Sequence, residues 1–129
     1  MSTSGIDFTS GQIVDGNESL WRRIHRTWIK KCDNGICRPS SAAFKSKDVS
    51  VDIASKTTPT ESIRDSDALA SVLASVPKNL GHEVYEAPIK DDPKLPDNPA
   101  HAIIAGKINQ RKAREIAKAC KWVVIRNFS

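Results

Sequence analysis

The clearest alternation of apolar and polar residues in the chain runs over residues 49–53. Val49, Val51 and Ile53 are apolar, and the two residues between them are polar. Side chains of a β-strand point alternately to its two faces, so a period of two indicates a strand with one buried face. We therefore expect a half-buried strand at this position.

Residues 21–32 fit two patterns, and the residues that follow decide between them. From residue 20 to residue 28 an apolar residue recurs every four positions, which suits a helix, but the same residues also suit one face of a strand. The Asn-Gly pair at positions 34 and 35 favours positive φ angles and a tight hairpin turn. We therefore predict a mostly extended segment over residues 21–32 that turns and returns through residues 36–44.

A capping box marks the start of a helix. In Thr58-Pro59-Thr60-Glu61 the first threonine can accept a hydrogen bond from an early helical amide while the glutamate reaches back, and proline suits the first helical position. We expect Ile63 and the apolar run 68–76 to supply the buried side of this helix, with a break allowed at residues 65–67. Pro77 should interrupt it.

Short strands and one long loop follow. Residues 83–87 have the pattern of a brief strand, and residues 101–106 that of an interior strand, because adjacent isoleucines must both find cover. Residues 88–99 hold four prolines, so an exposed loop without regular structure is predicted between them. Residues 122–125 are expected to form a last strand or a docked tail.

A second helix is predicted from Asn109, which can cap it, to about Lys121. At about 100° per residue its apolar and basic side chains separate onto two faces. The apolar face holds Ala113, Ile116, Ala117 and Cys120, and the basic face holds Arg111, Arg114, Lys118 and Lys121.

These elements predict an α+β fold, with a small, twisted, mostly antiparallel sheet of four to six short strands and two or three helices packed on it. A chain of 129 residues suits one hydrophobic core. Residues 1–17 contain few apolar side chains, so we expect a flexible N-terminal arm. A single domain over residues 18–129, with the proline-rich loop at residues 88–99, should follow it.

The composition argues against a membrane-spanning or secreted protein. No apolar run approaches the roughly 18–20 residues that cross a bilayer, and the first residues lack the apolar stretch of a secretory signal. The chain has three cysteines, an odd number that fits reduced thiols better than a disulfide framework. We expect a cytoplasmic protein.

Cys32 and Cys37 flank the predicted turn with four residues between them, a spacing found in some metal-binding knuckles. Histidines and Cys120 could supply further ligands, but two cysteines without a second close pair do not complete a zinc site. We expect the two thiols to face each other across the hairpin, and we predict neither a metal nor another cofactor.

Positive charge is concentrated in two parts of the chain. Residues 20–39 hold six basic side chains and one acidic one, and residues 101–129 hold seven basic and one acidic, whereas the rest of the chain is net acidic. If the fold brings both segments together, they form one electropositive face that attracts phosphates. Lysines and arginines that only solvate the surface would give the same net charge of +5.

Our leading hypothesis is a small binding module for an anionic partner, in the first place RNA or DNA. Tryptophans near the basic residues could stack on bases, although tryptophan is more often part of a core. Gly106-Lys107, just before the free amides of the second helix, also suits an anion, without a full phosphate-loop pattern. The predicted contact residues are Arg22, Arg23, Arg26, Arg111, Arg114, Lys118 and Lys121.

Three alternative functions remain: two are enzymatic, and the third is that of a protein-interaction subunit. Arg22, Ser41 and His101 are similar in residue type to the set with which ADP-ribosyltransferases hold a nicotinamide dinucleotide, so a nucleotide-directed transferase or hydrolase could be centred there. Ser41, His101 and Asp52 could form a hydrolase triad, but no Gly-x-Ser-x-Gly motif accompanies them. In a protein-interaction subunit, the proline-rich loop and the flexible start would recognise a partner protein.

Overall fold

The computed structural model describes residues 11–32 and 35–126 of the chain, and the side chains at positions 31–37 are not described. Three predictions fall outside this description. They concern the turn at positions 33–34, the facing of Cys32 and Cys37, and the first ten residues of the N-terminal arm.

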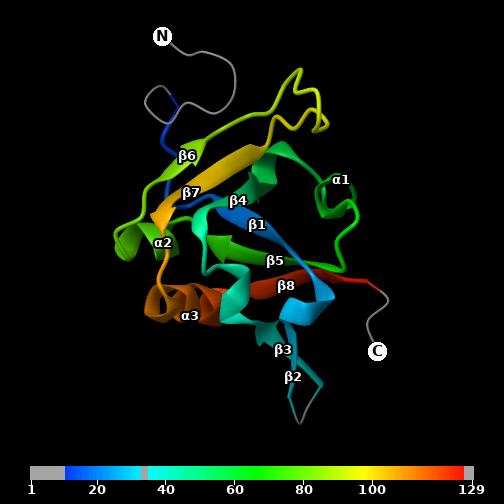
Figure 1. Ribbon diagram of the computed structural model, residues 1–129, viewed down its shortest axis with the longest axis vertical. Coiled ribbons are helices and arrows are strands. Elements are labelled where there is room, and N and C mark those ends of the chain that lie inside the picture. The colour runs from blue at the N-terminus through cyan, green and yellow to red at the C-terminus, as the bar shows by residue number, and fades with distance from the viewer. Residues whose placement is uncertain (1–10, 33–34, 127–129) are drawn as a thin grey trace.

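Six strands form one antiparallel sheet in the order β6-β7-β4-β1-β5-β8 (Figure 1). The described part also holds three α-helices and a two-stranded sheet, which confirms the predicted α+β class. The strands of the large sheet are β1 (Ser19–Ile24), β4 (Lys47–Ile53), β5 (Ala68–Leu73), β6 (Val84–Glu86), β7 (His101–Lys107) and β8 (Lys121–Ile125). The small sheet pairs β2 (Ile29–Cys32) with β3 (Gly35–Pro39), and the helices are α1 (Pro59–Ile63), α2 (Ser75–Asn79) and α3 (Gln110–Ala119).

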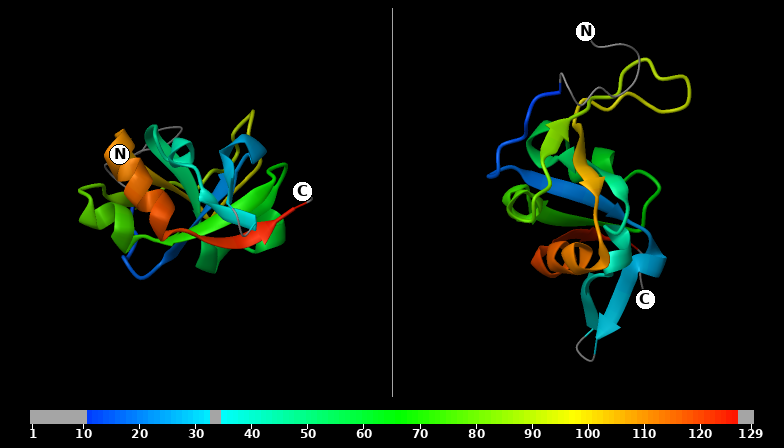
Figure 2. Two further views of the ribbon diagram at one scale, coloured as in Figure 1. Left: turned by 90° about the horizontal axis from the view of Figure 1, so that it is seen from below. Right: turned by 60° about the vertical axis from the view of Figure 1, so that its left-hand side comes forward.

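One face of the large sheet carries the main hydrophobic core. Leu20 of β1 lies opposite Ile53 of β4, and both are fully buried on this face with Phe44 from the connection between β3 and β4. Helix α3 covers the face with its buried residues, Ile116 among them, and its first turn is capped as predicted, since Asn109 Oδ1 accepts the amide of Lys112 at 2.9 Å. Figure 2 shows α3 and α1 on opposite faces of the sheet.

The prediction that residues 68–76 continue a helix was wrong. The capping box does start α1, but the helix ends at Ile63, and Arg64 adopts a φ of 50° in a tight turn closed by a hydrogen bond from Ser66 N to Ile63 O. The run then enters β5, which lies between β1 and β8. The sequence of an interior strand that is covered on both faces is a continuous apolar run. Periodicity alone does not distinguish such a run from a buried helix.

Two smaller boundaries also differ from prediction. Pro77 lies inside the short helix α2 rather than only ending a longer one. Helix α3 ends at Ala119, so Lys121 begins strand β8 instead of closing the helix. The predicted extended segment over residues 21–32 is confirmed as β1 and β2, joined by the 3₁₀ turn Arg26–Trp28.

Part of the segment predicted as an arm lies along the edge of the sheet. The amide of Val14 donates to Val84 O at 2.8 Å, and the amide of Glu86 donates to Gln12 O at 2.7 Å. Val14 is buried at 3% exposure. Residues 12–14 therefore cover the outer edge of β6.

The second face of the sheet is organised by a buried carboxylate. Asp52 of β4 is 1% exposed, and its oxygens accept three hydrogen bonds. The donors come from three separate segments: Arg23 Nη1 of β1 at 2.9 Å, Ser62 Oγ of α1 at 2.7 Å, and Asn98 Nδ2 of the proline-rich loop at 2.8 Å. A buried charge is costly unless it is paired and hydrogen-bonded. Asp52 therefore fixes α1 and the loop onto the sheet.

Replacing Asp52 by alanine should lower the free energy of unfolding by about 3 kcal/mol or more, because Arg23 then keeps a partly buried charge without a counter-charge. Urea unfolding at pH 7 measures this loss. The matched control is Asp65→Ala, at an exposed aspartate in the turn after α1, for which we expect a change within about 0.5 kcal/mol. Equal effects of the two substitutions would contradict the role given to Asp52.

Candidate anion-binding surface

The predicted basic face of α3 is exposed along its length. We use the name α3 stripe for Arg111, Arg114 and Lys118 of the helix together with Lys121 at the start of β8, all four of which are exposed. Lys118 lies 3.8 Å from Glu115, whereas Arg111, Arg114 and Lys121 have no ion pair within the described residues. A rise of 1.5 Å per residue places Arg111 and Lys118 about 10 Å apart along the helix.

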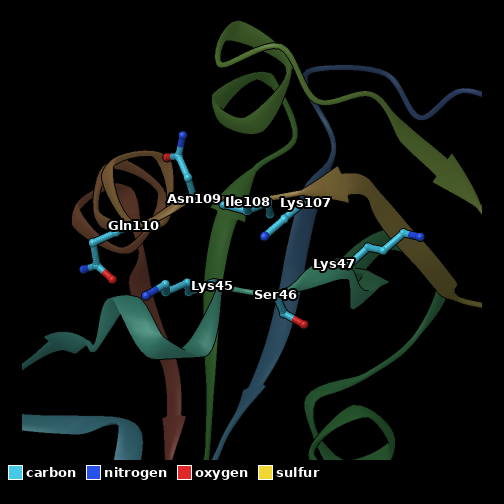
Figure 3. Close-up of a pocket in the computed structure, with 7 residues that line it drawn as sticks. All are labelled: Lys45, Ser46, Lys47, Lys107, Ile108, Asn109 and Gln110. Carbon is cyan, nitrogen blue, oxygen red and sulfur yellow. The ribbon is translucent and has the colours of Figure 1, made fainter.

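A cleft of about 360 Å³ lies beside the first turn of α3. In Figure 3, Lys45 and Lys107 extend toward α3, and Lys47 extends away from it. None of the described residues that line this cleft is acidic. The lining, which we call the lysine pocket, consists of Lys45, Ser46, Lys47, Lys107, Ile108, Asn109 and Gln110.

The backbone around the lysine pocket is held by a bulge between β4 and β7. Asp48 and Gly106 both have positive φ angles, 54° and 90°, and the amide of Gly106 donates to Asp48 Oδ1 at 2.8 Å. The amide of Ile108 donates to Ser46 O at 2.9 Å, which fixes the start of α3 against the start of β4. The position of the lysines at the pocket is therefore set by backbone contacts rather than by their own side chains.

The charges around the pocket repel one another. Lys47 and Lys107 are partners in the register of β4 and β7, but their side chains extend in opposite directions in Figure 3, so the charges gathered toward α3 are those of Lys45 and Lys107. The first turn of α3 contains no acidic residue, and it carries Arg111 and Lys112 where the helix dipole disfavours cations. Nearby Asp48 already accepts the Gly106 amide. A bound anion would relieve this repulsion.

Two backbone donors add to the positive potential. The amides of Gln110 and Arg111 make no hydrogen bond within the described residues, whereas the Lys112 amide is capped by Asn109. Unbonded amides at a helix start, together with the helix dipole, favour negatively charged groups.

The predicted contacts Arg22 and Arg23 lie on opposite faces of the sheet. Arg22 faces the core side, where its Nε donates to Ala43 O at 3.0 Å and its Nη1 to Ser50 O at 2.9 Å. Its guanidinium lies 5.4 Å from the ring centre of Trp28, and burial, with a smaller contribution from Arg23, lowers its pKa to about 10. Both arginines therefore have acceptors within the fold.

Arg26 differs from its two neighbours because its side chain is 61% exposed. Its backbone amide donates to Asp67 Oδ2 at 2.7 Å, and its Nη2 lies 3.7 Å from Asp67 Oδ1. An exposed pair at this distance holds the arginine weakly. A contact between Arg26 and an anionic partner stays a prediction.

The enzymatic residue sets are brought together only in part. Arg22 contacts the 3₁₀ turn Ser41–Ala43, and Ser41 Oγ accepts a hydrogen bond from Gln110 Nε2 at 2.9 Å on the α3 side. His101 lies on the other face, opposite Asp52 in the register of β4 and β7. The structure thus pairs Asp52 with His101 but places Ser41 away from both, and the serine that bonds Asp52 is Ser62.

Sequence reasoning singled out Lys107, in the pair Gly106-Lys107, as suited to an anion, but it missed Lys45 and Lys47. Lys45 and Lys47 follow the buried Phe44, and Lys107 follows the predicted strand at residues 101–106. The signal was present as basic residues at strand ends, but only the register between β4 and β7 brings them together. Ser62 and Asn98 were missed for the same reason, since their shared acceptor is distant in sequence.

Other candidate chemistry finds little support in the described residues. No group of three or more histidine, cysteine or acidic side chains there is arranged to hold a metal ion. Burial raises the pKa of the Cys120 thiol to about 12, and its Sγ lies 3.4 Å from Ile116 O. A thiol of that pKa is a poor nucleophile near neutral pH. No helix of the described part has the length and apolar character needed to cross a bilayer.

Comparison with known proteins returned no matching family model, no similar curated protein and no similar solved structure.

His101 makes the stability of the fold sensitive to acid. Its side chain is 5% exposed, and its Nδ1 lies 2.7 Å from Ala87 O. Burial lowers the pKa of His101 below its usual 6.5, against the opposing effects of the Ala87 hydrogen bond and of Asp52. The unfolded chain therefore binds a proton at a higher pH than the folded chain does.

The free energy of unfolding should accordingly fall as the pH drops below about 6.5 toward the pKa of His101 in the folded protein. In the variant His101→Gln this part of the pH dependence should disappear. Urea unfolding at pH 7.5, 6.5 and 5.5 measures it, and His25→Gln, at an exposed histidine, is the control that should keep the wild-type slope. A wild-type slope in the His101 variant would show that another group is responsible.

Proposed function

We propose that this protein binds nucleic acid through the α3 stripe and the lysine pocket. The observation that carries the proposal is the group of cations around the start of α3, where neither the first turn of the helix nor the described lining of the pocket holds an acidic residue. Isolated surface lysines need no explanation, but cations gathered beside a helix start without acidic residues are unfavourable in the free protein. Phosphates are the anions that such a surface attracts most strongly.

The dimensions of the α3 stripe suit a polyanion. Phosphates follow one another every 3.4 Å along the axis of a strand of double-stranded DNA, so a stripe of about 10 Å spans roughly three of them. The lysine pocket extends this surface beyond the N-terminal end of the helix. Contacts of this kind recognise the phosphate backbone and do not distinguish one base sequence from another.

The distribution of acidic residues favours one orientation of the protein on a polyanion. The loop that contains Asp91, Asp92 and Asp97 lies at the end of the molecule away from α3 (Figure 1). A polyanion approaching from the α3 side therefore meets cations, and the acidic loop points away from it. This arrangement favours one docking orientation and raises the association rate at low salt.

The construction of α3 argues against a lipid surface as the partner. An interfacial helix inserts an apolar face into the membrane. The apolar residues Ala113, Ile116 and Ala117 are buried against the sheet, so only the charged side of α3 is free. Binding to nucleic acid requires only that charged side of α3.

Neutralising two positions of the α3 stripe tests the proposal. The variant Arg111→Gln/Arg114→Gln should bind a fluorescent 20-nucleotide single-stranded DNA or RNA about tenfold more weakly. It should also reduce the slope of log K against log salt by about one per residue. Fluorescence anisotropy between 50 and 300 mM NaCl measures both quantities.

The matched control removes the same charge elsewhere. Lys90 and Lys94 are exposed on the proline-rich loop, and the variant Lys90→Gln/Lys94→Gln should keep the wild-type affinity and salt slope. Equal losses in the two double variants would mean that net charge alone causes binding. Absence of binding to every nucleic acid at 50 mM NaCl would disprove the proposal.

A further inference from the structure

The lysine pocket and the α3 stripe differ in shape, although both are basic. The stripe lies on the outside of a helix and is open on all sides, as a contact with a continuing backbone requires. The pocket is a concave site of about 360 Å³ at the point where the helix begins. Its volume is near the lower limit for sites that hold small molecules, so it has room for about one nucleotide.

The charge of the pocket exceeds what a phosphodiester needs. Lys45 and Lys107 extend two ammonium groups toward α3, and Lys47 adds a third positive charge from the other side of the strand end. Among the described residues, the lining holds no carboxylate, and the Gln110 and Arg111 amides are free to donate. A phosphodiester brings one negative charge and carries a substituent on both sides. A terminal phosphate has a second pKa near 6, so it carries close to two charges at pH 7, and it has three acceptor oxygens.

The inner side of the pocket is formed by backbone that is held in place. Ile108 is 1% exposed, and its amide donates to Ser46 O, so the starts of β4 and α3 are joined at the pocket. Asn109 and Gln110 are engaged in holding the wall, through the Lys112 amide and Ser41 Oγ respectively. A group with one substituent can enter such a site and leave by the same opening.

We propose that the lysine pocket holds the terminal phosphate of a nucleic acid strand, whose following phosphates lie along the α3 stripe. This inference rests on the proposed function and adds its specificity: the protein recognises phosphorylated strand ends. Lys45 and Lys107, which extend toward α3 in Figure 3, bind the phosphate oxygens together with the free amides. Lys47, which extends away, contributes through its charge.

The first experiment compares strand ends. Fluorescence anisotropy at 100 mM NaCl and pH 7.5 would use 12-nucleotide single strands with a 5′-phosphate, a 3′-phosphate or hydroxyls at both ends. We expect at least one phosphorylated strand to bind about tenfold more tightly than the hydroxyl strand. That preference should shrink at pH 5.5, where the terminal phosphate loses its second charge. Equal binding of the three strands would overturn the inference and leave the proposed function standing.

Two double variants separate the pocket from the stripe. Lys45→Gln/Lys107→Gln should abolish the preference for a phosphorylated end, and the loss of two cations should also weaken the binding of the hydroxyl strand. Arg111→Gln/Arg114→Gln should weaken all three strands and keep the preference. A preference that survives in the lysine variant would place the recognition elsewhere. If no strand binds at all, the proposed function fails rather than the pocket alone.

Inorganic phosphate and a nucleoside monophosphate, tested at constant ionic strength, give a readout that does not depend on strand binding. A ligand that binds only the folded protein raises its melting temperature. Both anions should stabilise the wild type and leave Lys45→Gln/Lys107→Gln unchanged, and each should bind more weakly than the phosphorylated strand. A monophosphate that binds as tightly as the strand would identify a free nucleotide as the ligand and overturn the assignment to strand ends.

Discussion

The fold depends on the burial of one carboxylate. Removing a charge from water costs several kcal/mol per ion, so Asp52 is tolerated only because Arg23, Ser62 and Asn98 all reach it. These donors belong to a strand, a short helix and a loop, which Asp52 joins at one point. Helix α1 has five residues and the loop little regular structure, and neither would be stable alone. Asp52 thus holds α1 and the proline-rich loop in place on one face of the sheet.

This constraint determines which basic residues are available for binding. Neighbouring residues of a strand point to opposite faces. Arg22 therefore points to the face that α3 covers, whereas Arg23 points to the other face and donates to Asp52. The sequence places both in one basic segment, but the fold uses them to satisfy carbonyl and carboxylate oxygens on different sides. Within the described residues, α3 and the ends of β4 and β7 supply exposed cations that have no ion pair. Net charge along the chain is therefore a poor guide to the location of an anion site.

Sequence reasoning succeeded where a local pattern decides the structure. The alternation in β4, the capping residues Thr58 and Asn109 and the proline-rich loop all act through neighbours in sequence. It failed for β5, because an apolar run that is covered on both faces carries no period. It found the lysine pocket only in part: Gly106-Lys107 was singled out, but the position of Lys45 and Lys47 beside it depends on a register and a bulge that no local signal contains. The α3 stripe was predictable, but its continuation into a concave site was not.

If the lysine pocket binds an anion as we propose, the site works against the stability of its own fold. The bulge at Asp48 and Gly106 and the hydrogen bond from Ile108 hold the backbone in place regardless of the side chains. The fixed backbone therefore keeps these cations beside the start of α3 in the free protein. Part of the proposed binding energy of an anion would come from neutralising this concentration of positive charge. Such a site requires no conformational change, and its affinity for an anion should increase with the charge of that anion.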